Sequence, residues 1–317
     1  MVHEDAYEKY KKIEDLPVDV KIVLPPEGME RKGIIQLHHG MAEHKGRYSH
    51  VLQYFSSNGY ICAMHDARGH GKSMENEKDL GYFGEDGANM VVEDTHAVTV
   101  YLKNNYPDLP VILIGHSFGS LVVRAYVKKY DYEIDRLFVV GSPSDNKLKA
   151  FGMLLIELIT IFKNDRETST FIEKLFNSQF DKAYRKKCNN ENRKYVKHGQ
   201  ICSNESVVEE YTRDRKAGFT YTLNGYYTIM NVMSKVYSGS KSRWVRKNQS
   251  LKITFLSGEE DIYLVNENKF LQAVNRMKEI GYRNVDYKLY PNMYHEIFNE
   301  RGNEQVFKDI LEMIRDI

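Results

Sequence analysis

Residues 111–119 read Val-Ile-Leu-Ile-Gly-His-Ser-Phe-Gly, an apolar run that ends in the pattern G-x-S-x-G. This pattern places Ser117 on a sharp turn between a strand and a helix, where its hydroxyl projects and the flanking glycines relieve crowding. A lone match arises by chance, but residues 120–127 can form the helix that the pattern requires. We therefore interpret Ser117 as a nucleophile rather than as an idle serine in a glycine-rich turn.

Five further apolar runs resemble the one before Ser117, and they lie at residues 33–40, 60–66, 137–142, 252–258 and 285–290. Near-continuous apolar strands of this length are typical of a parallel sheet covered on both faces. Segments with helical spacing of apolar residues alternate with them. The alternation predicts an α/β fold with a doubly wound, mostly parallel sheet, whose strands end along one ligand-binding edge.

This alternation fails between about Pro143 and Gln249, where helical patterns occur without a convincing strand. We interpret the segment as a helical insertion that covers the edge of the sheet. The predicted organisation is a core formed by residues 1–143 and 250–317, interrupted by a helical cap at residues 144–249.

Composition excludes several classes of protein. The net charge of +1 lacks the basic excess of a nucleic-acid binder, so no nucleic-acid partner is expected. Three scattered cysteines are too few for a disulfide framework and suit a reducing compartment. The first residues include no apolar segment typical of a signal peptide, and the apolar run at 151–162 is shorter than the ~20 residues of a membrane span. We expect a cytoplasmic protein.

A serine hydroxyl needs a base that removes its proton. In sites built on this kind of turn, an acid and then a histidine follow the serine along the chain. Only His198 and His295 follow Ser117. His295 comes just after a predicted strand, at the edge where Ser117 emerges, whereas His198 lies in the insertion. We therefore predict that His295 is the general base.

The acid that orients His295 is expected directly after the strand at 252–258. Asp261 would accept the Nδ1–H of the histidine, fix its tautomer and stabilise the imidazolium. Glu259 and Glu260 are neighbouring alternatives that are better interpreted as solvated loop charges. Asp286 is a third alternative, but it lies at the start of a predicted strand and so at the wrong edge.

Two backbone N–H groups are expected to stabilise the oxyanion of the reaction. The N–H of Phe118 begins the helix after Ser117, where unpaired N–H groups carry partial positive charge. The second donor is expected in the loop that follows the first buried strand, and Met41 is our candidate. The histidines of this loop lack a metal-ligand pattern of cysteines or acids, so we predict no metal site.

Taken together, these segments resemble the monoacylglycerol lipase and lysophospholipase branch of the α/β-hydrolases. The resemblance rests on residues 39–44 with Arg47 and Tyr48, on residues 66–73 and 115–119, and on 258–261 and 295–296. It implies an eight-stranded sheet, a helical cap, no cofactor and hydrolysis of acyl esters. It also implies the triad Ser117, Asp261 and His295, with Met41 and Phe118 at the oxyanion hole. Asp66, Arg68 and His70 are expected to support the loops of the site through hydrogen bonds.

The expected substrate is a small-molecule acyl ester of the monoacylglycerol or lysophospholipid type, and no obligate protein partner is implied. The residues expected to contact it are His39, Gly40, His116, Tyr221 and Tyr226. Two alternatives stay open. One is an aminopeptidase of the proline iminopeptidase type, in which Glu205, Glu209 and Glu210 would hold a substrate ammonium. The other is a binding protein without catalytic activity.

The cap carries two features that could serve a lipid substrate. The run at 151–162 has apolar residues on every face, which predicts packing inward as a roof over an acyl pocket or peripheral contact with lipid aggregates. Simple core packing of the cap is an equal alternative. A basic cluster could attract anionic head groups or form a solvated helix face, and comprises Arg185, Lys186, Lys187, Arg193, Lys194 and Lys197.

Overall fold

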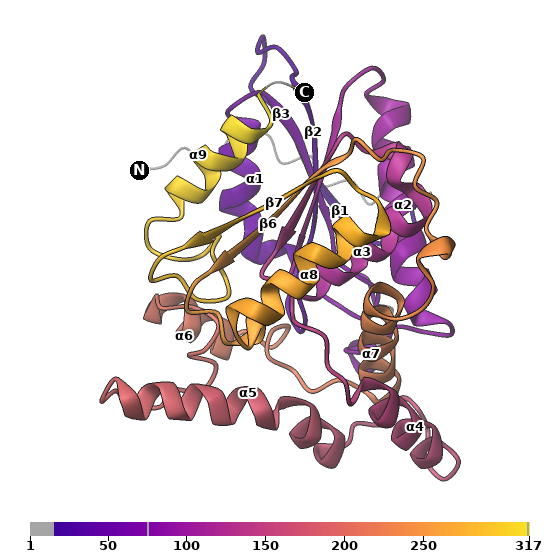
Figure 1. The fold of residues 1–317 in the computed structure, drawn as a ribbon, viewed down its shortest axis with the longest axis vertical. Coiled ribbons are helices and arrows are strands. Elements are labelled where there is room, and N and C mark those ends of the chain that lie inside the picture. Colours follow the sequence, from indigo (N-terminus) through magenta and orange to yellow (C-terminus); the bar gives the residue numbers. More distant parts are fainter. Residues whose placement is uncertain (1–15, 75, 316) are drawn as a thin grey trace.

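A computed structural model describes residues 16–74, 76–315 and 317. Its centre is a sheet in which the described residues form seven strands, in the order β1-β3-β2-β4-β5-β6-β7 (Figure 1). The strands are β1 (Val20–Val23), β2 (Gly33–His38), β3 (Tyr60–His65), β4 (Val111–His116), β5 (Arg136–Val140), β6 (Lys252–Gly258) and β7 (Asn284–Tyr290). All neighbours are parallel except β1, which pairs antiparallel with β3.

The doubly wound, mostly parallel sheet is therefore confirmed. The six predicted apolar runs correspond to β2–β7, and the antiparallel strand β1 was not among the predictions. The resemblance implies eight strands, of which the described residues contain seven, and residues 1–15 lie outside the described part of the chain.

Helices cover both faces of the sheet (Figure 1). One buried cluster packs α1 and α9 against one face, and a larger cluster packs α2, α3 and α8 against the other. The helices of the core are α1 (Ser49–Ser56), α2 (Gly87–Asn105), α3 (Phe118–Tyr130), α8 (Glu267–Ile280) and α9 (Glu304–Met313). Short 3-10 helices are η1 (Lys45–Tyr48), η2 (Glu77–Asp79), η3 (Asp131–Glu133) and η5 (Ile262–Leu264).

The local sequence explains where α8 begins and ends. The side chain of Asn266 accepts a hydrogen bond from the N–H of Lys269 and so caps the first turn. Phe270, Val274 and Met277 bury one face of the helix against the sheet. Gly281 ends it with φ 122°, a conformation that glycine adopts without strain.

Between β5 and β6 the chain forms helices and no strand, in residues that are all described. They are α4 (Lys149–Thr160), α5 (Thr170–Asn190), α6 (Glu205–Arg213), α7 (Leu223–Tyr237) and η4 (Lys241–Arg243). Of these, α4, α5 and α6 lie at the end of the molecule toward which the parallel strands run (Figure 1). Contacts of α7 with α2 and α3 connect this region to the core. The division into a core at 1–143 and 250–317 and a cap at 144–249 remains our proposal.

The register of the sheet brings three loops together. His116 at the end of β4 pairs with Val140 of β5, and Val140 pairs with Leu256 of β6. Gly258 at the end of β6 pairs with Tyr290 at the end of β7. The loops that follow β4, β6 and β7 therefore leave the sheet at the same edge. Among the described helices, none combines the length and the apolar character needed to cross a bilayer.

Candidate active site

Ser117 lies between β4 and α3 in a strained backbone conformation, with φ 54° and ψ −116°. Residues other than glycine rarely adopt positive φ. The flanking glycines allow this turn to pack closely. A Cβ on Gly115 would lie 2.4 Å from the carbonyl oxygen of Gly119, and a Cβ on Gly119 would lie 2.4 Å from that of His38. The G-x-S-x-G pattern thus meets a steric requirement on both sides of the serine.

His295 and Asp261 complete a hydrogen-bonded chain with this serine. The Nε2 of His295 lies 2.8 Å from the Oγ of Ser117, and its Nδ1 lies 2.8 Å from Oδ2 of Asp261. Asp261 is held in turn, because its carboxylate accepts hydrogen bonds from the N–H of Tyr263 (2.8 Å) and the Oγ of Ser257 (3.1 Å). The geometry allows His295 to take a proton from Ser117 while Asp261 stabilises the resulting imidazolium.

Among the described residues, the alternative acids form no hydrogen bond with His295. Glu259 is exposed, and Glu260 forms an ion pair with Lys187. Asp286 is exposed near the beginning of β7, at the opposite edge of the sheet. The alternative base His198 lies in the loop between α5 and α6, with its ring 5.1 Å from that of Tyr211.

The two residues whose N–H groups are expected to bind an oxyanion, Met41 and Phe118, line the cavity that contains Ser117. Phe118 is the first residue of α3, so its N–H has no partner within the helix. The hydrogen bonds found among the described residues include none donated by the N–H of Met41 or Phe118. Both groups therefore remain available to a ligand beside Ser117.

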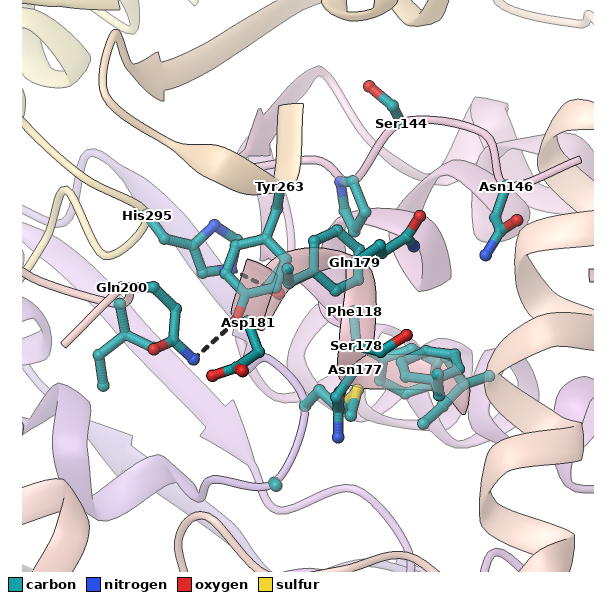
Figure 2. Close-up of a pocket in the computed structure, with 18 of the residues that line it drawn as sticks. Phe118, Ser144, Asn146, Asn177, Ser178, Gln179, Asp181, Gln200, Tyr263 and His295 are labelled. Carbon is teal, nitrogen blue, oxygen red and sulfur yellow. Dashed lines mark hydrogen bonds between the residues drawn. The ribbon is translucent and has the colours of Figure 1, made fainter. Parts of the chain in front are cut away.

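The cavity measures about 930 Å³ and lies between the edge of the sheet and the cap helices (Figure 2). His116 and Tyr226 line it, as does His295. His39, Gly40 and Tyr221 are not among its lining residues, and their expected role as substrate contacts stays a prediction. None of the residues 151–162 lines the cavity either, so this helix is not its roof.

Tyr221 holds the loop after β2 through hydrogen bonds. Its hydroxyl accepts a hydrogen bond from the N–H of Ala42 at 2.6 Å and lies 2.7 Å from Nε2 of His70. The ring of His39 accepts a hydrogen bond from the N–H of Ala67 at 2.9 Å. These contacts fix the loop that contains Met41.

Hydrogen bonds of Asp66 and Arg68 fix the neighbouring segment, as predicted. Asp66 accepts from the backbone N–H groups of Lys45 and Lys72 at 2.8 Å each. Arg68 forms two hydrogen bonds with Asp94, at 2.7 and 2.8 Å. Asp66 therefore holds backbone of this segment and Arg68 ties it to α2, and neither residue lines the cavity.

A buried network of charged groups, which the sequence did not single out, joins the same loop to His295. Glu43 accepts hydrogen bonds from the N–H of Gly40 (2.6 Å), from the Tyr48 hydroxyl (2.8 Å) and from Arg47 (2.5 Å). Arg47 also binds Glu296, which follows His295 in sequence. A signal was present, because Glu43, Arg47 and Glu296 all lie in the segments that carry the family resemblance.

His116 is part of this network. Its Nε2 lies 3.2 Å from the carbonyl oxygen of His295, and its Nδ1 lies 2.8 Å from the hydroxyl of Tyr48 and 3.3 Å from Glu43. Burial alone would lower the pKa of His116, but the hydrogen bond and charge of Glu43 raise it above the ordinary value. His116 therefore connects the strand before Ser117 with the loop that carries His295.

In the described part of the chain, no group of three or more histidine, cysteine, aspartate or glutamate side chains could hold a metal ion.

Residues 29–302 match the family model described as serine aminopeptidase, S33. The chain belongs to this family. It is 25% identical over 283 residues to the monoacylglycerol lipase of Mycolicibacterium smegmatis, covering 89% of this chain and 88% of that protein. It is also 25% identical over 276 residues to a phospholipase of Bacillus subtilis, covering 87% of this chain and 92% of that protein. The resemblance to the monoacylglycerol lipase and lysophospholipase branch is thereby confirmed.

Solved structures agree on the fold of this family member. A thermostable carboxyl esterase from Bacillus coagulans in complex with glycerol superposes with a TM-score of 0.82 at 24% identity, over 95% of this chain and 94% of that one. The monoacylglycerol lipase of Paleococcus ferrophilus superposes with a TM-score of 0.68 at 17% identity, over 94% and 98%. The protein is an ester hydrolase of the lipase and esterase type, and its substrates are small-molecule esters.

Proposed function

We propose that this hydrolase cleaves single-chain acyl esters, monoacylglycerols or lysophospholipids, through an acyl-enzyme on Ser117. His295 removes the proton of the Ser117 hydroxyl as Oγ attacks the ester carbonyl. The N–H groups of Met41 and Phe118 stabilise the tetrahedral oxyanion. The alcohol departs with the proton held by His295, and a water molecule, activated by the same histidine, releases the fatty acid and restores Ser117.

One observation carries this proposal, namely that the Ser117–His295–Asp261 chain opens into a large cavity with a predominantly apolar wall. Such a wall suits an acyl chain better than a polar substrate. Its apolar side chains come mainly from α3, α5 and α7, and include Leu121, Phe176, Ile229, Met230 and Met233. The names of the relatives, monoacylglycerol lipase and phospholipase, agree with a lipid ester.

The aminopeptidase alternative lacks comparable support. It requires acidic side chains of the cap to hold a substrate ammonium inside the site. Glu205, Glu209 and Glu210 are exposed on α6, and none of them lines the cavity. The acids at 144–249 that do line it already accept hydrogen bonds within the protein, Asp145 from Lys149, Glu173 from Thr220, and Asp181 from Arg185 and Tyr195. Ester hydrolysis is therefore the function that we propose.

We further propose that the cap contacts lipid aggregates through α4. This helix buries Gly152 and Ile156, while apolar side chains on its other faces are exposed. The exposed set continues onto α5 and comprises Leu148, Phe151, Leu154, Leu158, Ile161, Phe162, Phe171 and Leu175. An apolar surface of this kind is typical of a helix that lies in a lipid interface.

The basic cluster of α5 and the following loop supports this contact less directly. Arg185 is paired with Asp181, Lys187 with Glu191 and Glu260, and Arg193 with Glu191. Much of the positive charge is therefore neutralised within the protein. We propose that the apolar side chains of α4 make the larger contribution to lipid contact.

The experiment that tests the proposed function is hydrolysis of monoacylglycerols of increasing acyl length by the protein and by its Ser117→Ala variant. A fluorophosphonate probe, applied in parallel, should modify Ser117. We expect turnover and labelling to be lost together in the variant, because the three side chains act as a unit. Turnover that survives Ser117→Ala would remove Ser117 from the mechanism, and absence of labelling in the unaltered protein would favour the binding-protein alternative.

A further inference from the structure

The position of His295 determines which part of the cavity receives the alcohol of the ester. When the acyl group is transferred to Ser117, the bond between the carbonyl carbon and the alcohol oxygen breaks, and the Nε2 proton of His295 passes to that oxygen. The oxygen must then lie within about 2.6–3.2 Å of Nε2. The alcohol portion therefore lies against the residues that surround His295, and the acyl chain extends away from them.

Tyr263 lines the cavity, and its ring packs against that of His295. The centroids of the two rings are 4.3 Å apart (Figure 2). Tyr263 belongs to η5, and its backbone N–H donates to Asp261 at 2.8 Å, which ties the tyrosine to the same loop as the acid. The ring of Phe180 packs against it with centroids 4.7 Å apart. The phenol is thus held in a defined place beside the reacting atoms.

Gln200 approaches the same hydroxyl from the loop between α5 and α6. Its Nε2 donates to the Tyr263 hydroxyl at 3.4 Å, which is longer than a typical hydrogen bond of this type (Figure 2). No acceptor for the hydrogen of Tyr263 itself is found among the described residues. Burial raises the pKa of Tyr263 to about 12, so the hydroxyl keeps this hydrogen at neutral pH. A phenol hydrogen and an amide group are therefore present in the cavity wall beside His295.

Other residues that line the cavity are apolar. The side chains that α3 and α7 contribute there include Leu121, Ile229, Met230 and Met233, which offer apolar surface. An ester with a long acyl chain and a polyhydroxy alcohol matches this asymmetry, because each half meets surface of its own polarity. A simple alkyl alcohol would leave the hydroxyl of Tyr263 and the amide of Gln200 without new partners.

We propose that Tyr263 and Gln200 bind the hydroxyl groups of the alcohol portion and make the enzyme selective for esters of glycerol over esters of simple alkanols. This inference rests on the proposed function, since it takes Ser117 and His295 as the reacting pair. It adds a pair of specificity-determining residues to that site. Hydrogen bonds made to the alcohol would also orient its oxygen toward Nε2 of His295.

The test compares two substrates that share an acyl chain and differ only in the alcohol, glycerol 1-decanoate and ethyl decanoate. Both are offered to the full-length protein and to its Tyr263→Phe and Gln200→Met variants, and kcat/KM is measured from the release of decanoate. Tyr132→Phe is the matched control, because Tyr132 is exposed in η3 and does not line the cavity. Thermal unfolding of each variant establishes that the fold is intact.

We expect Tyr263→Phe and Gln200→Met each to lower kcat/KM for the glyceryl ester about three- to tenfold, the effect of a lost hydrogen bond, and to change that for the ethyl ester less than about twofold. The ring of Phe still packs on His295, so the pH profile should not move. Equal losses on both esters, or no loss on either, would overturn the inference. If the unaltered protein hydrolyses neither ester, the proposed function itself fails, and the inference fails with it.

Discussion

Arg47 forms a bidentate ion pair with Glu296, with Nη1–Oε1 at 2.8 Å and Nη2–Oε2 at 2.7 Å, although the two residues are 249 positions apart. Arg47 follows the loop that contains Met41, and Glu296 follows His295. The pair therefore joins the loop expected to bind the oxyanion to the loop that carries the base. Since Glu43 binds the same guanidinium, one cation balances two buried carboxylates.

Replacing Arg47 by an uncharged residue should destabilise the folded protein. We expect Arg47→Met to lower the free energy of unfolding by about 3–5 kcal/mol, because it leaves Glu43 and Glu296 buried without their partner. The measurement is urea unfolding at neutral pH. Arg213→Met is the control, because Arg213 and Glu209 form a pair on the exposed face of α6, where ion pairs contribute little. Similar effects of the two changes would contradict this account of the network.

The assignment of the acid leads to a second prediction. We expect Asp261→Asn to reduce kcat by about 10⁴-fold without unfolding the protein, because an amide at this position favours the wrong tautomer of His295. Steady-state hydrolysis of a soluble short-chain ester measures the effect. Asp286→Asn should leave kcat nearly unchanged, since Asp286 lies at the other edge of the sheet. A large loss in Asp286→Asn with activity retained in Asp261→Asn would reverse the assignment.

Buried histidines beneath the site predict that the protein is sensitive to acid. Burial lowers the pKa of His38 and His39 to about 4 and that of His70 to about 3. The unfolded chain binds these protons near pH 6.5, whereas the folded protein does not. The stabilising contribution is therefore complete above about pH 6.5 and decreases as the pH falls from there toward 4. Unfolding free energies measured by urea between pH 7.5 and pH 4.5 should show this decline.

His65 provides a variant that isolates the effect. Both of its ring nitrogens are buried, and neither has a hydrogen-bond partner among the described residues. Burial lowers the pKa of His65 well below its usual range. His65→Met, which removes the titrating group from a buried position, should make unfolding less dependent on pH. An unchanged slope in this variant would show that other groups cause the decline.

The exposed apolar surface formed by α4 and the residues just after it yields a fourth prediction. Phe162 is 88% exposed, so Phe162→Asp should not alter the stability of the fold. We expect it to weaken binding to phospholipid vesicles, because an ionised carboxylate opposes transfer of this surface to lipid. Vesicle sedimentation measures the binding, and hydrolysis of a soluble ester should remain unchanged. Val245→Asp is the control, at an exposed apolar residue outside this surface, and equal loss in both variants would argue against α4 as the contact.

Much of the architecture could be predicted because buried parallel strands leave a strong local pattern. The apolar runs before Ser117, Asp261 and His295 each became a strand, and the loops followed where the runs ended. The short strand β1 was missed, since Val20–Val23 has only four residues and pairs antiparallel at the edge of the sheet. The sequence shows that the run at 151–162 is apolar on all faces. Its exposure depends on the packing of α4, because α7 covers only one face of that helix.

The sequence by itself determined the order of strands and helices, the glycines that permit the turn at Ser117, and a short set of candidates for acid and base. These are local properties, set by periodicity, chain order and the steric needs of single residues. Only the tertiary structure decided that Glu296 meets Arg47, that Tyr221 supports a loop instead of lining the cavity, and that Gln200 reaches Tyr263 beside His295. Such contacts depend on where distant loops meet once the sheet has formed and the cap has packed on it. No local pattern in the sequence encodes these meeting points.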